Sequence, residues 1–136
     1  MFKLSDKPLD THALAAVLED VHAGALVTFE GKVRNHNHGR TVTQLEYEGA
    51  EDMASAEFAK IVTDAREQFE IVGAAGAHRV GILQPGETAV WIGVTAVHRS
   101  AAFAACKFVI DELKKRLPVW KKEHYTDGSS GWINNP

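Results

Sequence analysis

The sequence predicts an α+β domain in which pairs of mainly antiparallel strands alternate with helices. Two observations favour this class. Segments of alternating apolar and polar residues occur in neighbouring pairs, and segments with apolar residues at helical spacing separate the pairs. The glycine-rich phosphate-binding patterns of doubly wound nucleotide-binding proteins are not found in the sequence. The expected order is α-β-β-α-β-β-α-β, in a single domain that spans residues 1–136.

Each element of the first half follows from its own residues. Asp10 is a suitable N-cap for a short helix that ends near Leu18. Residues 25–33 and 41–48 have the alternating pattern of strands, whereas residues 34–40 between them are polar and turn-rich. We therefore expect a hairpin with residues 34–40 as its tip.

The second half is expected to repeat this arrangement around two main helices, the first over residues 51–69. The remaining expected elements are strands over 77–83 and 88–97 joined by a turn at 84–87, a helix over 100–117, a strand over 119–125, a turn over 127–131 and an anchoring contact at 132–133. Ser100 is the expected N-cap of the last helix. Pro118 ends that helix because proline lacks the amide that a further turn requires.

Composition narrows the class of protein. Hydrophobic residues make up 45% of the chain and charged residues 24%, as in ordinary globular domains. The net charge of −3 argues against general nucleic-acid binding, which usually needs a basic domain. No apolar run reaches the roughly 20 residues of a membrane span, and the polar N-terminal residues do not resemble a signal peptide. We therefore expect a cytoplasmic protein that binds neither nucleic acid nor membrane.

Cys106 is the only cysteine, which excludes an internal disulfide. It lies on the expected apolar stripe of the helix over 100–117, and this position favours a buried, unreactive side chain. The alternative, a reactive thiol, requires exposure and a positive environment. Lys107 does not provide that environment, because successive helical residues do not face each other.

His98, Arg99 and Ser100 stand where a strand is expected to end and a helix to begin. The first amides of a helix lack partners within the helix and favour negative charge. The guanidinium of Arg99 adds a forked donor suited to phosphate, and His98 can donate a further hydrogen bond. The alternative interpretation is an exposed arginine beside an ordinary helix start.

A second basic cluster lies between residues 114 and 122, where five of nine residues are lysine or arginine. Lys114 borders the apolar stripe of its helix, and strand alternation turns Lys121 and Lys122 to opposite faces. A lysine near apolar residues can have a lowered pKa and serve as acid, base or nucleophile. The alternative is a solvated helix end, since the helix dipole also favours cations there.

The expected hairpin tip and its flank are basic as well, with Lys32, Arg34, His36, His38 and Arg40. Such a loop can close over an anion, although an exposed, soluble turn explains the same residues. Two histidines without nearby cysteine or acidic ligands are a weak metal signal, so no metal site is predicted. The pair His78-Arg79 repeats the pair at 98–99 and is interpreted as structural.

Taken together, several segments resemble the large, catalytic subunit of molybdopterin synthase, and the likeness covers residues 12–133. These segments are GALVTFEGKVRNHN at 24–37, HRVG at 78–81, PGE at 85–87, VTAVHRSAAF at 94–103 and LKKRLPVWKKE at 113–123. The resemblance implies an α/β hammerhead fold with an added antiparallel sheet. It also implies two large subunits in a central homodimer with a small subunit at each end, a heterotetramer.

The activity that the resemblance implies is sulfur transfer in molybdenum cofactor biosynthesis, with no cofactor of its own. Cyclic pyranopterin monophosphate receives two sulfurs and becomes the dithiolene molybdopterin. The donor is the C-terminal thiocarboxylate of a small, ubiquitin-like sulfur-carrier subunit. A phosphate-ester substrate agrees with an anion site, and a sulfur carried by another protein removes the need for a reactive cysteine.

The matching positions imply the site residues: Lys114 and Lys121 as catalytic, Arg34, His98 and Arg99 as substrate-binding, and Glu123 as supporting. The chain departs from the family at its end. Relatives often place an arginine just after the C-terminal tryptophan, where it reaches the neighbouring subunit, whereas no arginine follows Arg116 here.

Two other classes of function fit parts of the sequence. A non-catalytic phosphate-binding module could use the same basic residues, and it would bind ligand without incorporating sulfur. An RNA-binding domain is disfavoured by the acidic pI and by the lack of clustered aromatic residues in the sequence.

Overall fold

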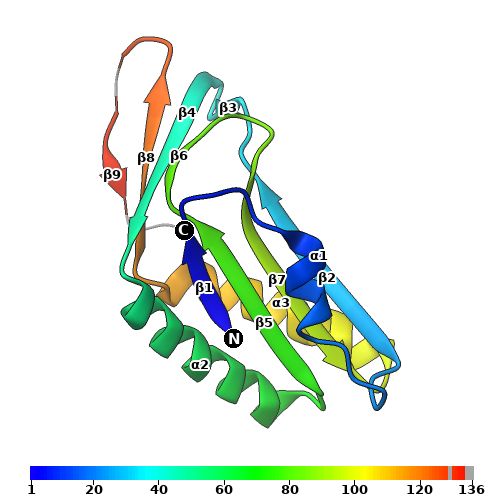
Figure 1. The fold of residues 1–136 in the computed structure, drawn as a ribbon. Helices are drawn as coiled ribbons and strands as arrows, with labels where there is room; N and C mark the ends of the chain where they lie inside the picture. The colour runs from blue at the N-terminus through cyan, green and yellow to red at the C-terminus, as the bar shows by residue number, and fades with distance from the viewer. Residues whose placement is uncertain (129, 134–136) are drawn as a thin grey trace.

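The computed structural model describes residues 1–128 and 130–133 of the chain and arranges them as two sheets and three helices (Figure 1). The helices are α1 (Thr11–Ala16), α2 (Glu51–Gln68) and α3 (Arg99–Arg116), and the strands are β1 (Phe2–Ser5), β2 (Ala25–Lys32), β3 (His36–Asn37), β4 (Arg40–Gly49), β5 (Gly73–Arg79), β6 (Gly81–Leu83), β7 (Thr88–Ala96), β8 (Val119–Tyr125) and β9 (Trp132–Ile133). Of the helices in the described residues, none has the length and apolar character to cross a membrane. This architecture confirms the α+β prediction.

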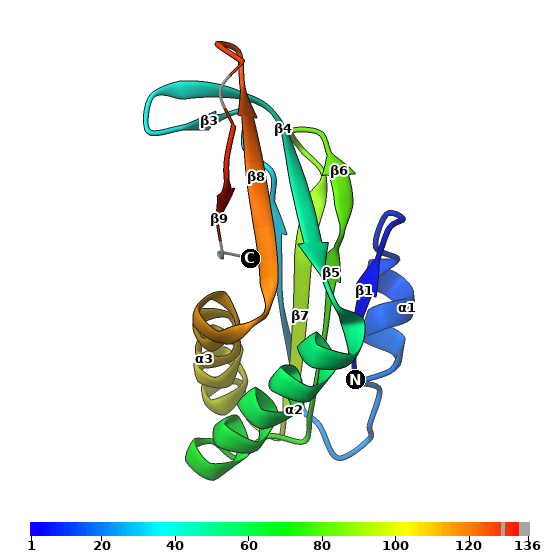
Figure 2. The same ribbon diagram turned by 90° about the vertical axis from the view of Figure 1, so that its left-hand side faces the viewer.

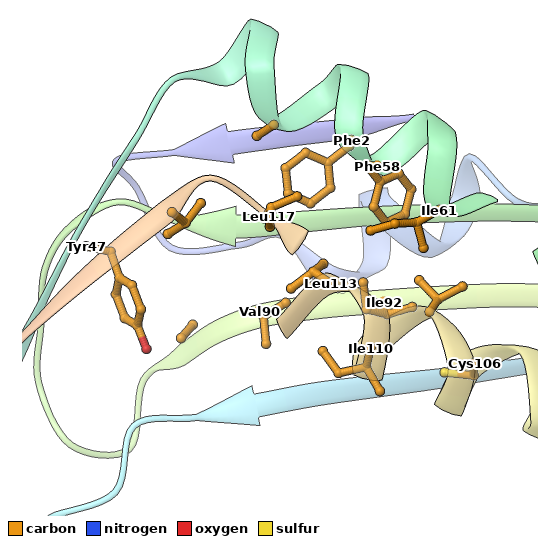
Figure 3. Close-up of a cluster of buried hydrophobic side chains, with 14 of the residues drawn as sticks. Phe2, Tyr47, Phe58, Ile61, Val90, Ile92, Cys106, Ile110, Leu113 and Leu117 are labelled. Carbon is orange, nitrogen blue, oxygen red and sulfur yellow. The ribbon is translucent and has the colours of Figure 1, made fainter. Parts of the chain in front are cut away.

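The first sheet has the strand order β1-β5-β7-β2. The edge strand β1 runs parallel to β5, and the other pairs are antiparallel. Figure 2 shows α2 and α3 together on one face of this sheet and α1 on the other. Figure 3 shows the main core between the sheet and the two long helices, where Phe58 and Ile61 of α2 meet Ile92 of β7 and Leu113 of α3.

The second sheet joins β3, β4, β8 and β9, with β6 also paired to β4. The expected hairpin between residues 25–33 and 41–48 is wrong, because β2 pairs with β7 while β4 pairs with β8 and β6. The two segments therefore belong to different sheets. Their alternating pattern shows that each is a strand with one buried face, but it holds no information about which strand lies beside it.

The expected strand over 77–83 is divided between the two sheets. Its first part belongs to β5, which begins earlier than expected, at Gly73, and pairs with β7 as the predicted hairpin requires. Its last part, β6, pairs with β4 in the other sheet. Gly81 stands at this change of sheet with a φ of 90°, a left-handed conformation that residues other than glycine rarely adopt.

The third helix begins one residue earlier than predicted. His98, and not Ser100, occupies the N-cap position of α3, and its side chain makes no capping hydrogen bond. The helix ends before Pro118 as expected. Cys106 is buried in the main core, which confirms the interpretation of this residue as a small hydrophobic side chain.

Candidate active site

A pocket of about 130 Å³ opens between the end of β2, the start of β4, the last turn of α3 and β8. The residues that line it are Lys32, Arg34, His36, Asn37, Val42, Leu45, Tyr47, Lys114, Lys121 and Glu123. Four of these side chains are lysine or arginine, and one is an acid. The pocket is therefore suited to an anionic ligand.

Two elements place the lysines on this pocket. Lys114 lies in the last turn of α3, because the helix ends before Pro118. The chain then returns as β8, antiparallel to β4, with Lys121 opposite Tyr47 in the register. Directly paired residues share a face of a sheet, so Lys121 faces the pocket, whereas Lys122 faces away, with its ammonium 5.6 Å from the ring centre of Trp132.

Glu123 holds the ammonium of Lys121. Its carboxylate lies 3.3 Å from the Lys121 Nζ, and the residue is only 6% exposed. Burial alone would raise the pKa of this carboxyl, but hydrogen bonds from Tyr125 and Asn37, together with the charge of Lys121, lower the pKa below its usual value. Glu123 is therefore ionised at neutral pH and forms an ion pair with the Lys121 ammonium.

Lys114 has a different environment. Its pKa is lowered by desolvation and by the nearby positive charges of Lys121 and Arg34. The residue as a whole remains exposed to solvent, and it also lines the pocket. A lysine with a lowered pKa releases its proton more readily than an ordinary lysine.

Tyr47 forms an apolar part of the pocket wall, with His78 behind it at 4.7 Å between ring centres. Burial, followed by the charge of Glu123, raises the pKa of Tyr47 to about 12. Burial lowers the pKa of His78 to about 4 although its Nδ1 lies 2.6 Å from the carbonyl of Arg79. Both side chains are neutral at pH 7. The buried position of the pair at 78–79 agrees with its structural interpretation.

The structure does not bring His98 and Arg99 to this pocket. They lie at the first turn of α3, beside a separate surface hollow that also includes Gly24 and Ser100. Lys114 lies fifteen positions further along the same helix, which corresponds to about 22 Å. Arg99 is therefore not brought to Lys114 and Lys121 within one chain, whereas Arg34, Lys114, Lys121 and Glu123 are brought together.

The basic side chains between positions 32 and 40 also fall into two groups, one in the pocket and one outside it. Lys32, Arg34 and His36 line the pocket, whereas Arg40 pairs with Asp127 and stacks on the ring of Tyr125. Among the residues that the structure describes, no group of three or more histidine, cysteine, aspartate or glutamate side chains is placed to hold a metal ion.

Sequence reasoning missed three polar side chains of the site, namely Asn37, Tyr47 and Tyr125. Strand alternation places Tyr125 on the same face as Lys121 and Glu123, which is a usable signal. The positions of Asn37 and Tyr47 depend on the pairing of β4 with β8. These two strands are far apart in the chain, and their sequence patterns do not indicate that they pair.

The fold and the site together define a small α+β protein with a basic pocket for an anionic ligand, formed largely at a helix C-terminus and the strand that follows it. The family model described as MoaE protein matches residues 4–116. The chain therefore belongs to the MoaE protein family.

Relatives and solved structures agree with this assignment. The molybdopterin synthase catalytic subunit of Nostoc sp. is 41% identical over 98% of this chain and 81% of the relative. That of Thermoplasma volcanium is 38% identical, over 96% of this chain and 95% of the relative. The crystal structure of molybdopterin synthase from Staphylococcus aureus superposes with a TM-score of 0.90 at 32% identity, covering 97% of this chain and 96% of that chain.

Proposed function

We propose that this chain is the catalytic subunit of a molybdopterin synthase. In this function it transfers sulfur from the C-terminal thiocarboxylate of a small ubiquitin-like partner to cyclic pyranopterin monophosphate. The observation that carries the proposal is the convergence of Arg34, Lys114 and Lys121 on one pocket, in a chain whose relatives are enzymes of this name.

The chemistry of the pocket suits this substrate. A phosphate ester and a thiocarboxylate are both anions, and the pocket offers the positive charges that attract them. Each sulfur transfer forms a carbon–sulfur bond on the pterin and expels an oxygen, which needs a proton as it leaves. Water then cleaves the bond between that sulfur and the acyl carbon of the donor, whose C-terminus becomes an ordinary carboxylate. Cys106 plays no part, because it lies in the buried core and not in the pocket. Burial also raises the pKa of its thiol to about 11.

The two lysines have different roles in this proposal. The ammonium of Lys121, paired with Glu123, stabilises negative charge that develops on the substrate. Lys114, with its lowered pKa, exchanges a proton more readily and supplies it to the departing oxygen. Arg34 binds the phosphate, since a guanidinium donates in a forked geometry that matches phosphate oxygens.

His98 and Arg99 remain proposed substrate-binding residues, but the geometry sets a condition on this role. They lie about 22 Å along α3 from Lys114, so they cannot contact the same small molecule within one chain. A second copy of the chain, in the homodimer that the resemblance implies, would have to supply them. Each pocket would then contain residues of two chains.

The test is the conversion of cyclic pyranopterin monophosphate by the purified chain with a thiocarboxylated small subunit, followed by mass spectrometry of the pterin. We expect a product that has gained two sulfurs. Binding of the substrate without any gain of sulfur, with an active small subunit present, would instead identify a phosphate-binding module.

A further inference from the structure

Glu123 receives hydrogen bonds from two residues that have no role so far. The Asn37 amide donates to both carboxylate oxygens, at 3.1 Å and 2.9 Å, and the Tyr125 hydroxyl donates to Oε2 at 2.5 Å. The ammonium of Lys121 contacts the other oxygen, Oε1. One buried carboxylate thus joins Asn37 of β3, Tyr125 on its own strand β8 and the pocket lysine Lys121.

The strand geometry explains this convergence. Residues 121, 123 and 125 alternate along β8 and therefore share one face. Burial of a carboxylate costs free energy unless its oxygens accept hydrogen bonds. Here two neutral donors, Asn37 and Tyr125, supply most of those hydrogen bonds. With Oε2 bound to Tyr125 and Asn37, the carboxylate cannot rotate freely, and Oε1 is held toward Lys121.

We propose that Asn37 and Tyr125 are positioning residues for the sulfur transfer: they fix the carboxylate of Glu123, and Glu123 in turn fixes the ammonium of Lys121 in the pocket. This inference rests on the proposed function. Neither side chain needs to touch the substrate for this role, so both act through Lys121.

The charges of these groups support the arrangement. Burial raises the pKa of Glu123, whereas the hydrogen bonds from Tyr125 and Asn37 and the charge of Lys121 lower it to a greater extent. The hydrogen bond to Glu123 also raises the pKa of Tyr125, so its hydroxyl keeps its proton and remains a donor at neutral pH. Removal of either donor is therefore expected to raise the pKa of Glu123.

The two positioning residues differ in what else they hold. Tyr125 contacts the carboxylate through its hydroxyl, and its ring lies 3.6 Å from the guanidinium carbon of Arg40, a contact that phenylalanine can keep. Asn37 additionally ties β3, and with it the segment that contains Arg34 and His36, to β8. Loss of the Tyr125 hydroxyl should therefore affect kcat, whereas loss of the Asn37 amide should affect both kcat and KM.

The first experiment measures pterin conversion by Tyr125→Phe in the wild-type chain and in Lys121→Ala. Displacement of a catalytic group by about 1 Å can cost on the order of a hundredfold in rate, so we expect kcat to fall roughly ten- to a hundredfold with KM within about twofold. In the Lys121→Ala background Tyr125→Phe should have no further effect. An equal loss in both backgrounds, or no loss in the wild-type chain, overturns the proposal.

A matched control is Thr43→Val, which removes a hydroxyl hydrogen bond to the carbonyl of His124 in the same sheet. The Thr43 hydroxyl donates to the carbonyl of His124, and Thr43 is not among the residues that line the pocket, so this variant should retain wild-type turnover. Asn37→Ala completes the set, with the expected rise in KM for the pterin as well as the fall in kcat.

A second measurement does not depend on turnover. Titration of the Glu123 carboxyl by carbon NMR should give a higher pKa in Tyr125→Phe and Asn37→Ala than in the wild-type chain, and an unchanged pKa in Thr43→Val. An unchanged pKa in the first two variants overturns the positioning role. A wild-type chain that makes no sulfurated pterin refutes the proposed function instead, and the titration then still decides whether the two donors control Glu123.

Discussion

Lys114 is the residue on which the proposed chemistry depends most directly. Its pKa is lowered by desolvation and by the charges of Lys121 and Arg34, and it faces the same pocket as both. We expect Lys114→Ala to lower kcat by at least about a hundredfold, the usual effect of removing a positioned proton donor. Turnover with thiocarboxylated small subunit measures this loss.

The matched control for that variant is Lys115→Ala. Lys115 is the next residue on the helix, but it is solvent-exposed and pairs with Glu112 outside the pocket. This substitution should leave kcat unchanged. Wild-type turnover by Lys114→Ala would remove Lys114 from the mechanism.

His78 makes stability depend on pH. Its pKa falls from 6.5 to about 4 in the folded chain, first because of burial, so between these values the unfolded chain binds more protons. The contribution of neutral His78 to the free energy of unfolding is therefore complete above about pH 6.5. It is lost as the pH falls toward 4, a change of about 3 kcal/mol. Urea unfolding at pH 7 and pH 4.5 measures this change in the free energy of unfolding. His78→Phe, which cannot ionise, should lose less stability over this interval, and an equal loss would contradict the assignment.

At the scale of the elements, the change of sheet at Gly81 requires a backbone conformation that residues other than glycine rarely adopt. A Cβ at this position would meet no atom within 4 Å, so a substitution costs conformational energy and creates no clash. Gly81→Ala is expected to lower the free energy of unfolding by about 1–2 kcal/mol, since φ is 90° here. Chemical denaturation measures this effect. Gly131→Ala is the control, because Gly131 also has open space but no positive φ, and it should be nearly neutral.

The helices could be predicted closely from the sequence, and the sheets only in part. The apolar stripes of α2 and α3 and the stop at Pro118 are local signals, and both helices lie within two residues of their expected bounds. The strand β1 was missed because four residues at the chain end give little pattern, although Phe2 packs on Phe58. The partners of β2 and β4 were predicted wrongly, because pairing depends on contacts between distant segments.

Contacts between distant segments also limited how much of the candidate site could be predicted from the sequence. The resemblance selected Lys114 and Lys121, and the pocket that contains both is consistent with that choice. Asn37 reaches Glu123 across 86 positions of the chain, a contact that appears only when β4 and β8 are paired. The separation of Arg99 from Lys114 follows simply from the length of α3, which the sequence did predict.

At the scale of the whole molecule, the proposal that two chains share each pocket has a direct test. Arg99→Ala and Lys114→Ala should each be inactive alone. In a mixture that exchanges subunits at random, about a quarter of the pockets would contain Lys114 of one chain and Arg99 of the other, with both intact, as expected for a symmetric dimer. Recovery of about a quarter of wild-type activity on mixing is the expected result. No recovery, once exchange of subunits is verified, would rule out shared pockets.

Burial of the lone thiol has a practical consequence for all these experiments. Cys106 is 4% exposed among the core residues of α3, and its pKa of about 11 leaves almost no thiolate at neutral pH. An alkylating reagent therefore modifies the native chain only when α3 separates from the sheet. The rate of alkylation reports that opening in each variant without an engineered label, and it separates a loss of catalysis from a loss of native structure in the same sample.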